Sequence, residues 1–135
     1  MVVEVMGRNA GWIALHSGVA SGSDIILIPE IPFRLERICE VATTRLSRGK
    51  HFTIICVAEG AKPAGGEQFV ARRDPTSPDP IRLGGIAKFL ADEVEKKTGI
   101  ESRHVVLGHV QRGGCPVAAD REFATSLGHH AVEML

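Results

Sequence analysis

Residues 24–29 read DIILIP, an almost unbroken run of large aliphatic side chains. A run this short and this apolar is typical of a β-strand that is buried on both of its faces. Residues 52–58, FTIICVA, follow the same pattern, and the β-branched side chains of residues 2–6 and 103–107 indicate two further strands. We therefore expect four strands, one in each of these segments.

Segments with a helical repeat of apolar side chains separate these strands. The expected helices are residues 12–20, residues 35–46, a helix that carries the stripe Leu83, Ile86, Leu90 and Val94, and residues 118–135. Gly22, Gly49 and Gly99 follow the first three, as glycine commonly does where a helix ends. The resulting order, β-α-β-α-β-α-β-α, predicts the α/β class, with a mostly parallel sheet and helices on both faces.

Residues 60–80 interrupt this alternation. They contain the pair Gly65-Gly66 and four prolines, and these residue types break helices and strands, so we expect a loop. Its pair Arg72-Arg73 could be taken for an allosteric phosphate site. A solvated insertion is the preferred interpretation, and no effector site is assigned to the pair.

Length and composition fit one globular domain: 135 residues, of which 44% are hydrophobic and 24% charged. Sixteen basic residues balance sixteen acidic ones, which argues against broad nucleic-acid binding, because that depends on a positive surface. The apolar runs are far shorter than the ~20 residues that cross a membrane. The three cysteines are odd in number and widely separated, so neither a disulfide framework nor a zinc site is expected. We expect a cytoplasmic protein.

Both ends of the sequence look internal to a longer protein. Residues 1–6 already read as a strand, and residues 131–135 stop within an apolar helical pattern. An independent domain more often begins and ends in small or polar surface residues. We therefore expect an internal piece, with a complete small domain as the alternative.

Polar groups beside glycine follow three of the expected strands. They lie in the segments MGRNAG at 6–11, EGA at 59–61 and GHVQRGG at 108–114. In open α/β sheets, ligands bind beyond the carboxyl ends of the strands, and glycine lets the backbone come close to them. The sequence therefore directs attention to these three segments as one possible site.

The charges in these segments suit a phosphorylated polyol. Arg8, His109 and Arg112 could converge on a phosphate, because a guanidinium offers a planar, two-pronged donor to phosphate oxygens. Glu59, which only accepts hydrogen bonds when ionised, suits sugar hydroxyls. The spacing alone fits ordinary turns equally well, so at this point both interpretations stand.

Other sequence fingerprints are missing. Residues 7–11 do not match the GxGxxG of dinucleotide-binding folds, and no GxxxxGK[ST] phosphate loop is present. Trp12 is expected in the core. We assign no metal site to the two histidine pairs, which are expected to be surface or packing residues, the second pair pointing in different directions: His104 with His109, and His129 with His130.

Four runs of sequence, in the same order along the chain, resemble the phosphofructokinase family. They are VVEVMGRNAGWIALHSG, IILIPE, VAEGAKP and VVLGHVQRGGCP, the last followed by Asp120-Arg121. The resemblance extends nearly end to end, and MGR followed much later by GHVQRGG is highly specific. It is closest to the bacterial 6-phosphofructokinases, particularly the actinobacterial type.

The resemblance implies an enzyme with two α/β lobes, of which residues 1–135 would form most of one. One lobe binds the phosphoryl donor and Mg²⁺, and the other, which this chain resembles, binds fructose 6-phosphate. The implied reaction is transfer of a phosphoryl group from ATP to the 1-hydroxyl of fructose 6-phosphate, giving fructose 1,6-bisphosphate in glycolysis. A pyrophosphate-dependent phosphotransferase and a non-catalytic sugar-phosphate-binding module are the alternatives.

The resemblance also assigns roles to individual residues. Arg8 would bind the sugar phosphate and lie near the transferred phosphoryl group, as the catalytic residue of the set. Glu59 would hold sugar hydroxyls, whereas His109 and Arg112 would contact the 6-phosphate. Arg103 would reach the site of a neighbouring subunit, which implies a homo-oligomer with shared sites. The full set implied for fructose 6-phosphate is Met6, Gly7, Arg8, Glu59, Arg103, His109 and Arg112.

The sequence departs from the family pattern in what it lacks. The glycine-rich donor loop and the TIDND-like segment with the aspartate base are missing, and a further substrate arginine would fall before Val2. Ligands for Mg²⁺, which would act with ATP or pyrophosphate, would also lie outside these residues. Because phosphoryl transfer depends on positioning and on charge neutralisation by metal and cations, we expect no kinase activity from the 135 residues alone.

Overall fold

A computed structural model describes residues 1–73, 75–76 and 80–135. The sheet and its helices are built from β1 (Val2–Val5), α1 (Trp12–Ala20), β2 (Ile25–Leu27), α2 (Leu35–Ser47), β3 (Ile55–Ala58), α3 (Ile86–Thr98) and β6 (His104–Val106). A hairpin of β4 (Val70–Arg73) and β5 (Ile81–Leu83) is inserted before α3, and the 3-10 helix η1 (Gly108–Arg112) and α4 (Ala118–Glu133) follow β6.

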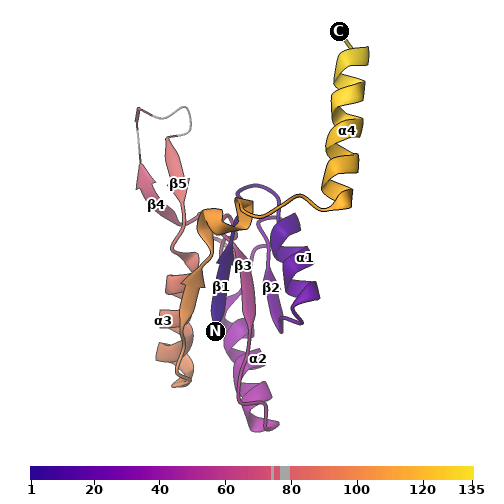
Figure 1. The fold of residues 1–135 in the computed structure, drawn as a ribbon. Helices are drawn as coiled ribbons and strands as arrows, with labels where there is room; N and C mark the ends of the chain where they lie inside the picture. Colours follow the sequence, from indigo (N-terminus) through magenta and orange to yellow (C-terminus); the bar gives the residue numbers. More distant parts are fainter. Residues whose placement is uncertain (74, 77–79) are drawn as a thin grey trace.

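The four main strands form one sheet in the order β2-β3-β1-β6 (Figure 1). All three pairings are parallel, and Val3 of the central strand β1 lies opposite Cys56 of β3 and Val105 of β6. The predicted α/β class with a parallel sheet is therefore confirmed. Because β1 lies between β3 and β6, the carboxyl ends of these three strands are neighbours.

Helices cover both faces of the sheet, as predicted. Successive side chains of a strand point to opposite faces. Cys56 and Ala58 of β3 therefore meet Ala14 of α1 on one side, whereas Ile55 and Val57 face the other side. On that second side, α2 and α3 pack against each other and form the larger core with residues that include Val2, Ile38, Ile86, Leu90 and Val94.

One carboxylate lies inside this larger core. Glu4 points from β1 toward α3 and is only 2% exposed. Its Oε2 atom accepts a hydrogen bond of 3.0 Å from the amide nitrogen of Ala87, in the first turn of α3. Gly85, with φ of 91°, precedes the helix and brings no side-chain cap. Glu4 therefore serves as the cap from a distant strand, because it accepts from an amide that has no partner within the helix.

The segment predicted as a loop, residues 60–80, contains β4, which pairs with β5 just after the segment to form a hairpin. Its strands are antiparallel, and the exposed side chains of Arg72 and Arg73 lie on β4. Leu83 ends β5, so its predicted place in the third helix is wrong, and α3 begins only at Ile86. Pro78 of the predicted loop lies outside the described residues.

Burial differs from the prediction at the sheet edges and at Trp12. The side chains of β3 are buried on both faces, but Ile25 and Ile26 of the edge strand β2 are only partly buried. Val106 of the other edge strand is 53% exposed. Trp12, predicted in the core, is 65% exposed and stacks on His16 at 5.7 Å between ring centroids. The small residues Ala14 and Gly18, rather than Trp12, face the sheet from α1.

The last helix stands away from the sheet (Figure 1). The apolar side chains of Phe123 and Leu127 on α4 are 67% and 55% exposed. No helix in the described parts of the chain combines the length and the apolar character that crossing a membrane requires.

We predict that replacing the buried carboxylate destabilises the fold. Glu4→Ala leaves the Ala87 amide without its acceptor, so the free energy of unfolding should fall by about 2–3 kcal/mol. Urea unfolding followed by circular dichroism measures this change. Glu67→Ala, at an exposed position, is the matched control and should cost less than about 0.5 kcal/mol. Equal values for the two variants would show that the buried hydrogen bond does not support α3.

Candidate functional site

Three loops leave the sheet at its carboxyl edge. They are residues 6–11 after β1, residues 59–61 after β3, and the chain through η1 after β6. Figure 1 shows η1 lying over the end of β1, and the two elements are in contact. These are the three segments in which the sequence places polar groups beside glycine, and the strand order brings them to one edge.

The first two loops are joined through Gly7. Its amide donates to Oε1 of Glu59 at 3.3 Å, and its carbonyl accepts from the amide of Gly60 at 3.0 Å. A Cβ atom on Gly60 would lie 1.9 Å from the carbonyl oxygen of Arg8. Gly7 itself has φ of 141°. Both positions therefore require glycine, one for a close backbone approach and one for its backbone conformation.

The first and third loops are joined through Gln111 and Arg112. Oε1 of Gln111 accepts a 3.2 Å bond from the amide of Met6, and its Nε2 donates to the carbonyl of Gly108 at 2.9 Å. Nε of Arg112 lies 3.4 Å from the sulfur of Met6. The Arg112 side chain is thus held beside the residue that precedes Gly7.

His109 lies on the same side of η1 as Arg112. Residues three apart in a 3-10 helix project in nearly the same direction, and these two are three apart. Both side chains are exposed. We call residues 6–11, 59–61 and 108–112 the loop cluster. It presents the cations Arg8 and Arg112 together with one carboxylate, Glu59, which favours an anionic ligand with hydroxyl groups.

The side chain of Arg8 reaches a fourth segment that sequence reasoning did not include. Its guanidinium donates to the backbone carbonyl of Ile81 in β5. The β4–β5 hairpin thus stands next to the loop cluster, which Figure 1 also shows. The predicted meeting of the three loops is confirmed, with this hairpin as an additional neighbour.

Comparison with known proteins agrees with this arrangement. The family model described as phosphofructokinase matches residues 1–135, the whole chain. The chain belongs to the phosphofructokinase family. It is 51% identical over 133 residues to a pyrophosphate–fructose 6-phosphate 1-phosphotransferase of Amycolatopsis methanolica. Over 136 residues it is 54% identical to ATP-dependent 6-phosphofructokinase 2 of Clostridium perfringens.

The matched regions cover only part of these relatives. The match includes 98% of the chain but 39% of the Amycolatopsis protein, and 100% of the chain but 37% of the Clostridium protein. The structure of phosphofructokinase from Saccharomyces cerevisiae superposes with a TM-score of 0.74 at 35% identity, over 98% of this chain and 16% of that one. The fold predicted from the resemblance is therefore confirmed.

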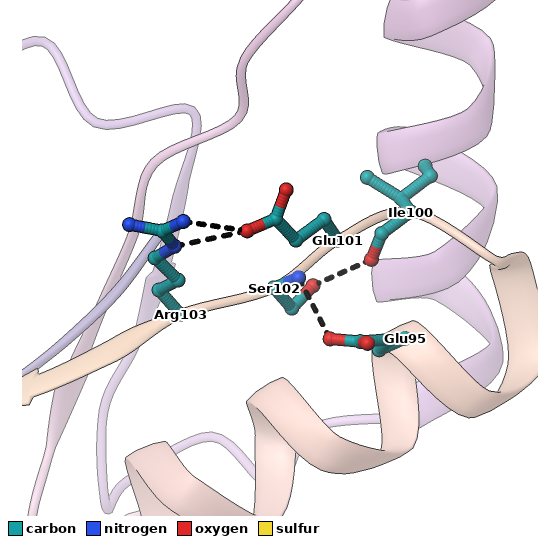
Figure 2. Close-up of polar contacts among 5 residues, drawn as sticks. All are labelled: Glu95, Ile100, Glu101, Ser102 and Arg103. Atoms are coloured by element: carbon teal, nitrogen blue, oxygen red, sulfur yellow. Dashed lines mark hydrogen bonds and ion pairs between the residues drawn. The ribbon is translucent and has the colours of Figure 1, made fainter.

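Arg103 is not part of the loop cluster of this phosphofructokinase segment. It lies just before β6, at the amino edge of the sheet, where its carbonyl accepts from the amide of Val2 at 2.8 Å. Its guanidinium donates to Oε1 of Glu101 through Nε and Nη2, at 3.0 and 2.8 Å (Figure 2). The adjacent Ser102 amide donates to Glu95 of α3 at 2.9 Å, which ties this turn to the helix. Of the seven predicted site residues, Arg103 alone therefore lies at the opposite edge.

Two glutamines hold the loops, and neither received a role in the sequence analysis. Gln111 stands inside the GHVQRGG motif. Its side chain is uncharged, and the site predicted from the strand ends contained only charged groups beside glycine. Its signal was its place between two candidate ligands, His109 and Arg112. Gln68, whose side chain reaches two of the loops, stands in the segment predicted as a solvated insertion. The sequence carries no signal for it.

The histidine pair on α4 lies differently from the prediction. His129 and His130 both turn toward Glu133, with nitrogen–oxygen distances of 3.3 and 3.1 Å. The two histidines were expected to point in different directions. Both can reach Glu133 because it lies one helical turn from each of them. All three are exposed and lie on α4, away from the loop cluster.

We predict that a methyl group at position 60 separates the first two loops. Gly60→Ala forces a Cβ atom against backbone atoms of Arg8, which cannot rotate away, so the free energy of unfolding should fall by about 1–3 kcal/mol. Gly128→Ala is the control, since a Cβ atom there meets nothing within 4 Å. In α4 it should leave the free energy unchanged or raise it by up to about 1 kcal/mol. Urea unfolding compares the two, and a Gly60→Ala variant as stable as the unaltered chain would contradict the close approach.

Proposed function

We propose that this chain forms the sugar-phosphate-binding part of a 6-phosphofructokinase. The reaction of the whole enzyme is phosphoryl transfer to the 1-hydroxyl of fructose 6-phosphate, which gives fructose 1,6-bisphosphate. The observation that carries the proposal is the joining of three strand-end loops around Gly7, which gathers Arg8, Glu59 and Arg112 at one edge of the sheet.

Each side chain of the loop cluster suits one part of a phosphorylated hexose. Arg112, with His109 on the same side of η1, offers donors to the 6-phosphate, and a guanidinium can contact two phosphate oxygens at once. Glu59 already accepts from Gly7 through one oxygen, and its second oxygen can accept from a sugar hydroxyl. This bond to Gly7 also sets the direction in which the carboxylate points.

Arg8 is the proposed catalytic residue of the cluster. It lies between the Glu59 loop and the β4–β5 hairpin, and its positive charge suits the phosphoryl group that is transferred. Charge that develops on the phosphoryl oxygens in the transition state is stabilised by a cation already held in place. In this proposal, Arg8 exchanges its bond to the Ile81 carbonyl for the more strongly charged phosphoryl oxygens.

The loop cluster does not fit Mg²⁺. That ion prefers oxygen ligands, often carboxylates, whereas the cluster brings two arginines and a histidine beside one carboxylate that is already hydrogen-bonded. We therefore propose that other residues of the whole enzyme hold magnesium and the donor, and we expect no phosphoryl transfer from the chain alone. Relatives named for ATP and for pyrophosphate match it almost equally well, so both donors remain candidates.

The position of Arg103 supports a shared site. At the amino edge of the sheet it cannot serve the loop cluster of its own chain, but a neighbouring copy could receive it. We therefore propose a homo-oligomer in which Arg103 contributes to the sugar-phosphate site of another subunit, where it would exchange its bonds to Glu101 for bonds to the substrate phosphate.

The three cysteines of the chain are free thiols, which supports the proposed cytoplasmic location.

The proposed function predicts that Arg112 contributes directly to sugar-phosphate affinity. A hydrogen bond to a charged group is worth about 1.5–3 kcal/mol, so Arg112→Ala should weaken binding of fructose 6-phosphate by about 10- to 100-fold. Isothermal titration calorimetry on a whole enzyme that contains this chain measures this. Arg37→Ala, which removes an exposed arginine of α2, is the matched control and should bind like the unaltered chain. Equal affinity for all three proteins would contradict the proposed site.

A further inference from the structure

The side chain of Gln68 connects the two loops that carry Arg8 and Glu59. Its Nε2 atom donates one hydrogen bond to the carbonyl of Arg8 and another to the carbonyl of Gly60, each 3.0 Å long. A side-chain amide has two N–H groups, so it can serve both acceptors at the same time. Gln68 is partly buried, which places these bonds away from full competition with water.

These two bonds lie beyond the end of the sheet and add to the bonds that already join the loops through Gly7. The ladder between β1 and β3 pairs residues up to Val5 and Ala58. Two further backbone bonds follow, from the Glu59 amide to Val5 and from the Gly60 amide to Gly7. Beyond that point the carbonyl oxygens of Arg8 and Gly60 converge on the same amide nitrogen. Two converging carbonyl oxygens repel each other unless a donor lies between them, and Gln68 supplies that donor.

The base of the β4–β5 hairpin fixes Gln68 in turn. The next residue, Phe69, packs against Phe89 of α3 with 4.6 Å between ring centroids. The Phe69 carbonyl accepts from the amide of Gly84 at 3.1 Å, which closes the base of the hairpin. Gln68 is therefore attached to a packed part of the fold rather than to a mobile surface loop.

The same hairpin also contacts the other end of Arg8. Ile81 of β5 accepts from the Arg8 guanidinium, while Gln68 binds the Arg8 backbone carbonyl. Arg8 is thus held at its main chain and at its side chain by one inserted element. The hairpin therefore helps to hold the site, although most side chains of β4 and β5 are exposed.

We propose that Gln68 is a positioning residue for the sugar-phosphate site. It fixes the distance between the Arg8 and Glu59 loops through its two bonds, and it touches neither substrate nor reacting atoms. This inference rests on the proposed function, because it assumes that fructose 6-phosphate binds between these loops. If the loops are not held in place beforehand, the binding groups must be ordered when the ligand binds. The cost of this ordering reduces the affinity.

Three variants, made in a whole enzyme that contains this chain, test the proposal by calorimetric titration with fructose 6-phosphate. Gln68→Met keeps the shape of the side chain but has no donor, and it should bind about 5- to 30-fold more weakly. Gln68→Asn keeps the amide but is one methylene shorter, so it can reach one carbonyl and should have intermediate affinity. Glu67→Met places the same new side chain at the exposed neighbouring position and should bind like the unaltered chain.

Amide hydrogen exchange gives a readout that needs no ligand. In Gln68→Met, the Gly60 amide, which donates to Gly7, should exchange about tenfold faster than in the unaltered chain. The amide of Val57, inside the sheet, should be unaffected. A general loss of stability would instead accelerate both amides, and this result would overturn a positioning role.

The outcomes separate this inference from the proposed function. If a whole enzyme that contains this chain does not bind fructose 6-phosphate, the proposed function fails. If it binds and Gln68→Met binds equally well, or if Gln68→Asn is no better than Gln68→Met, the positioning role is overturned. The order glutamine, asparagine, methionine in affinity, together with faster exchange at Gly60 alone, supports it.

Discussion

The backbone contact between Gly7 and Gly60 is the constraint on which the rest of the site depends. Parallel pairing of β1 with β3 brings the two strand ends side by side, but only glycine at position 60 lets the chain pass so close to the Arg8 carbonyl. This contact sets where the Arg8 side chain begins. It also sets where Glu59 points, because the carboxylate bonds to the Gly7 amide. The proposed sugar-phosphate site therefore depends on two glycines and one strand order.

The other contacts of the site extend this arrangement in two directions. Toward β6, Gln111 and Arg112 join the third loop to Met6. Toward the inserted hairpin, Gln68 and Ile81 hold Arg8 from the other side. Under the sheet, Glu4 links the central strand to the start of α3, whose Phe89 supports the base of the hairpin. Residues that stabilise the fold, such as Glu4 and Phe89, thus also support the geometry of the site.

The parts of this account that the sequence predicted are those governed by periodicity and by strand ends. The apolar run of residues 52–58 predicted β3, and the helical spacing of residues 35–46 predicted α2. The rule that ligands bind at the carboxyl ends of parallel strands led to Arg8, Glu59 and Arg112. The role of Arg103 came only from the resemblance to the family, because no spacing rule connects the amino edge of the sheet with a site at the other edge.

The parts that the sequence missed depend on tertiary contacts. The strands of the hairpin have only four and three residues, too few for an alternating pattern to be recognised, and the apolar stripe of α3 continues back to Leu83. Trp12 was expected in the core, whereas α1 turns its small residues toward the sheet. Gln68 acts through backbone carbonyls that are distant in sequence, and a carbonyl has no sequence signature.

The most direct test of a common site is an NMR titration of the chain with fructose 6-phosphate. The amide signals of residues 6–8, 59–60 and 109–112 should shift together and saturate at the same ligand concentration, because the three loops bind one molecule. Signals at the amino edge, around Arg103, should stay unchanged while the chain is monomeric. Shifts confined to one of the three loops, or centred elsewhere on the chain, would contradict the account.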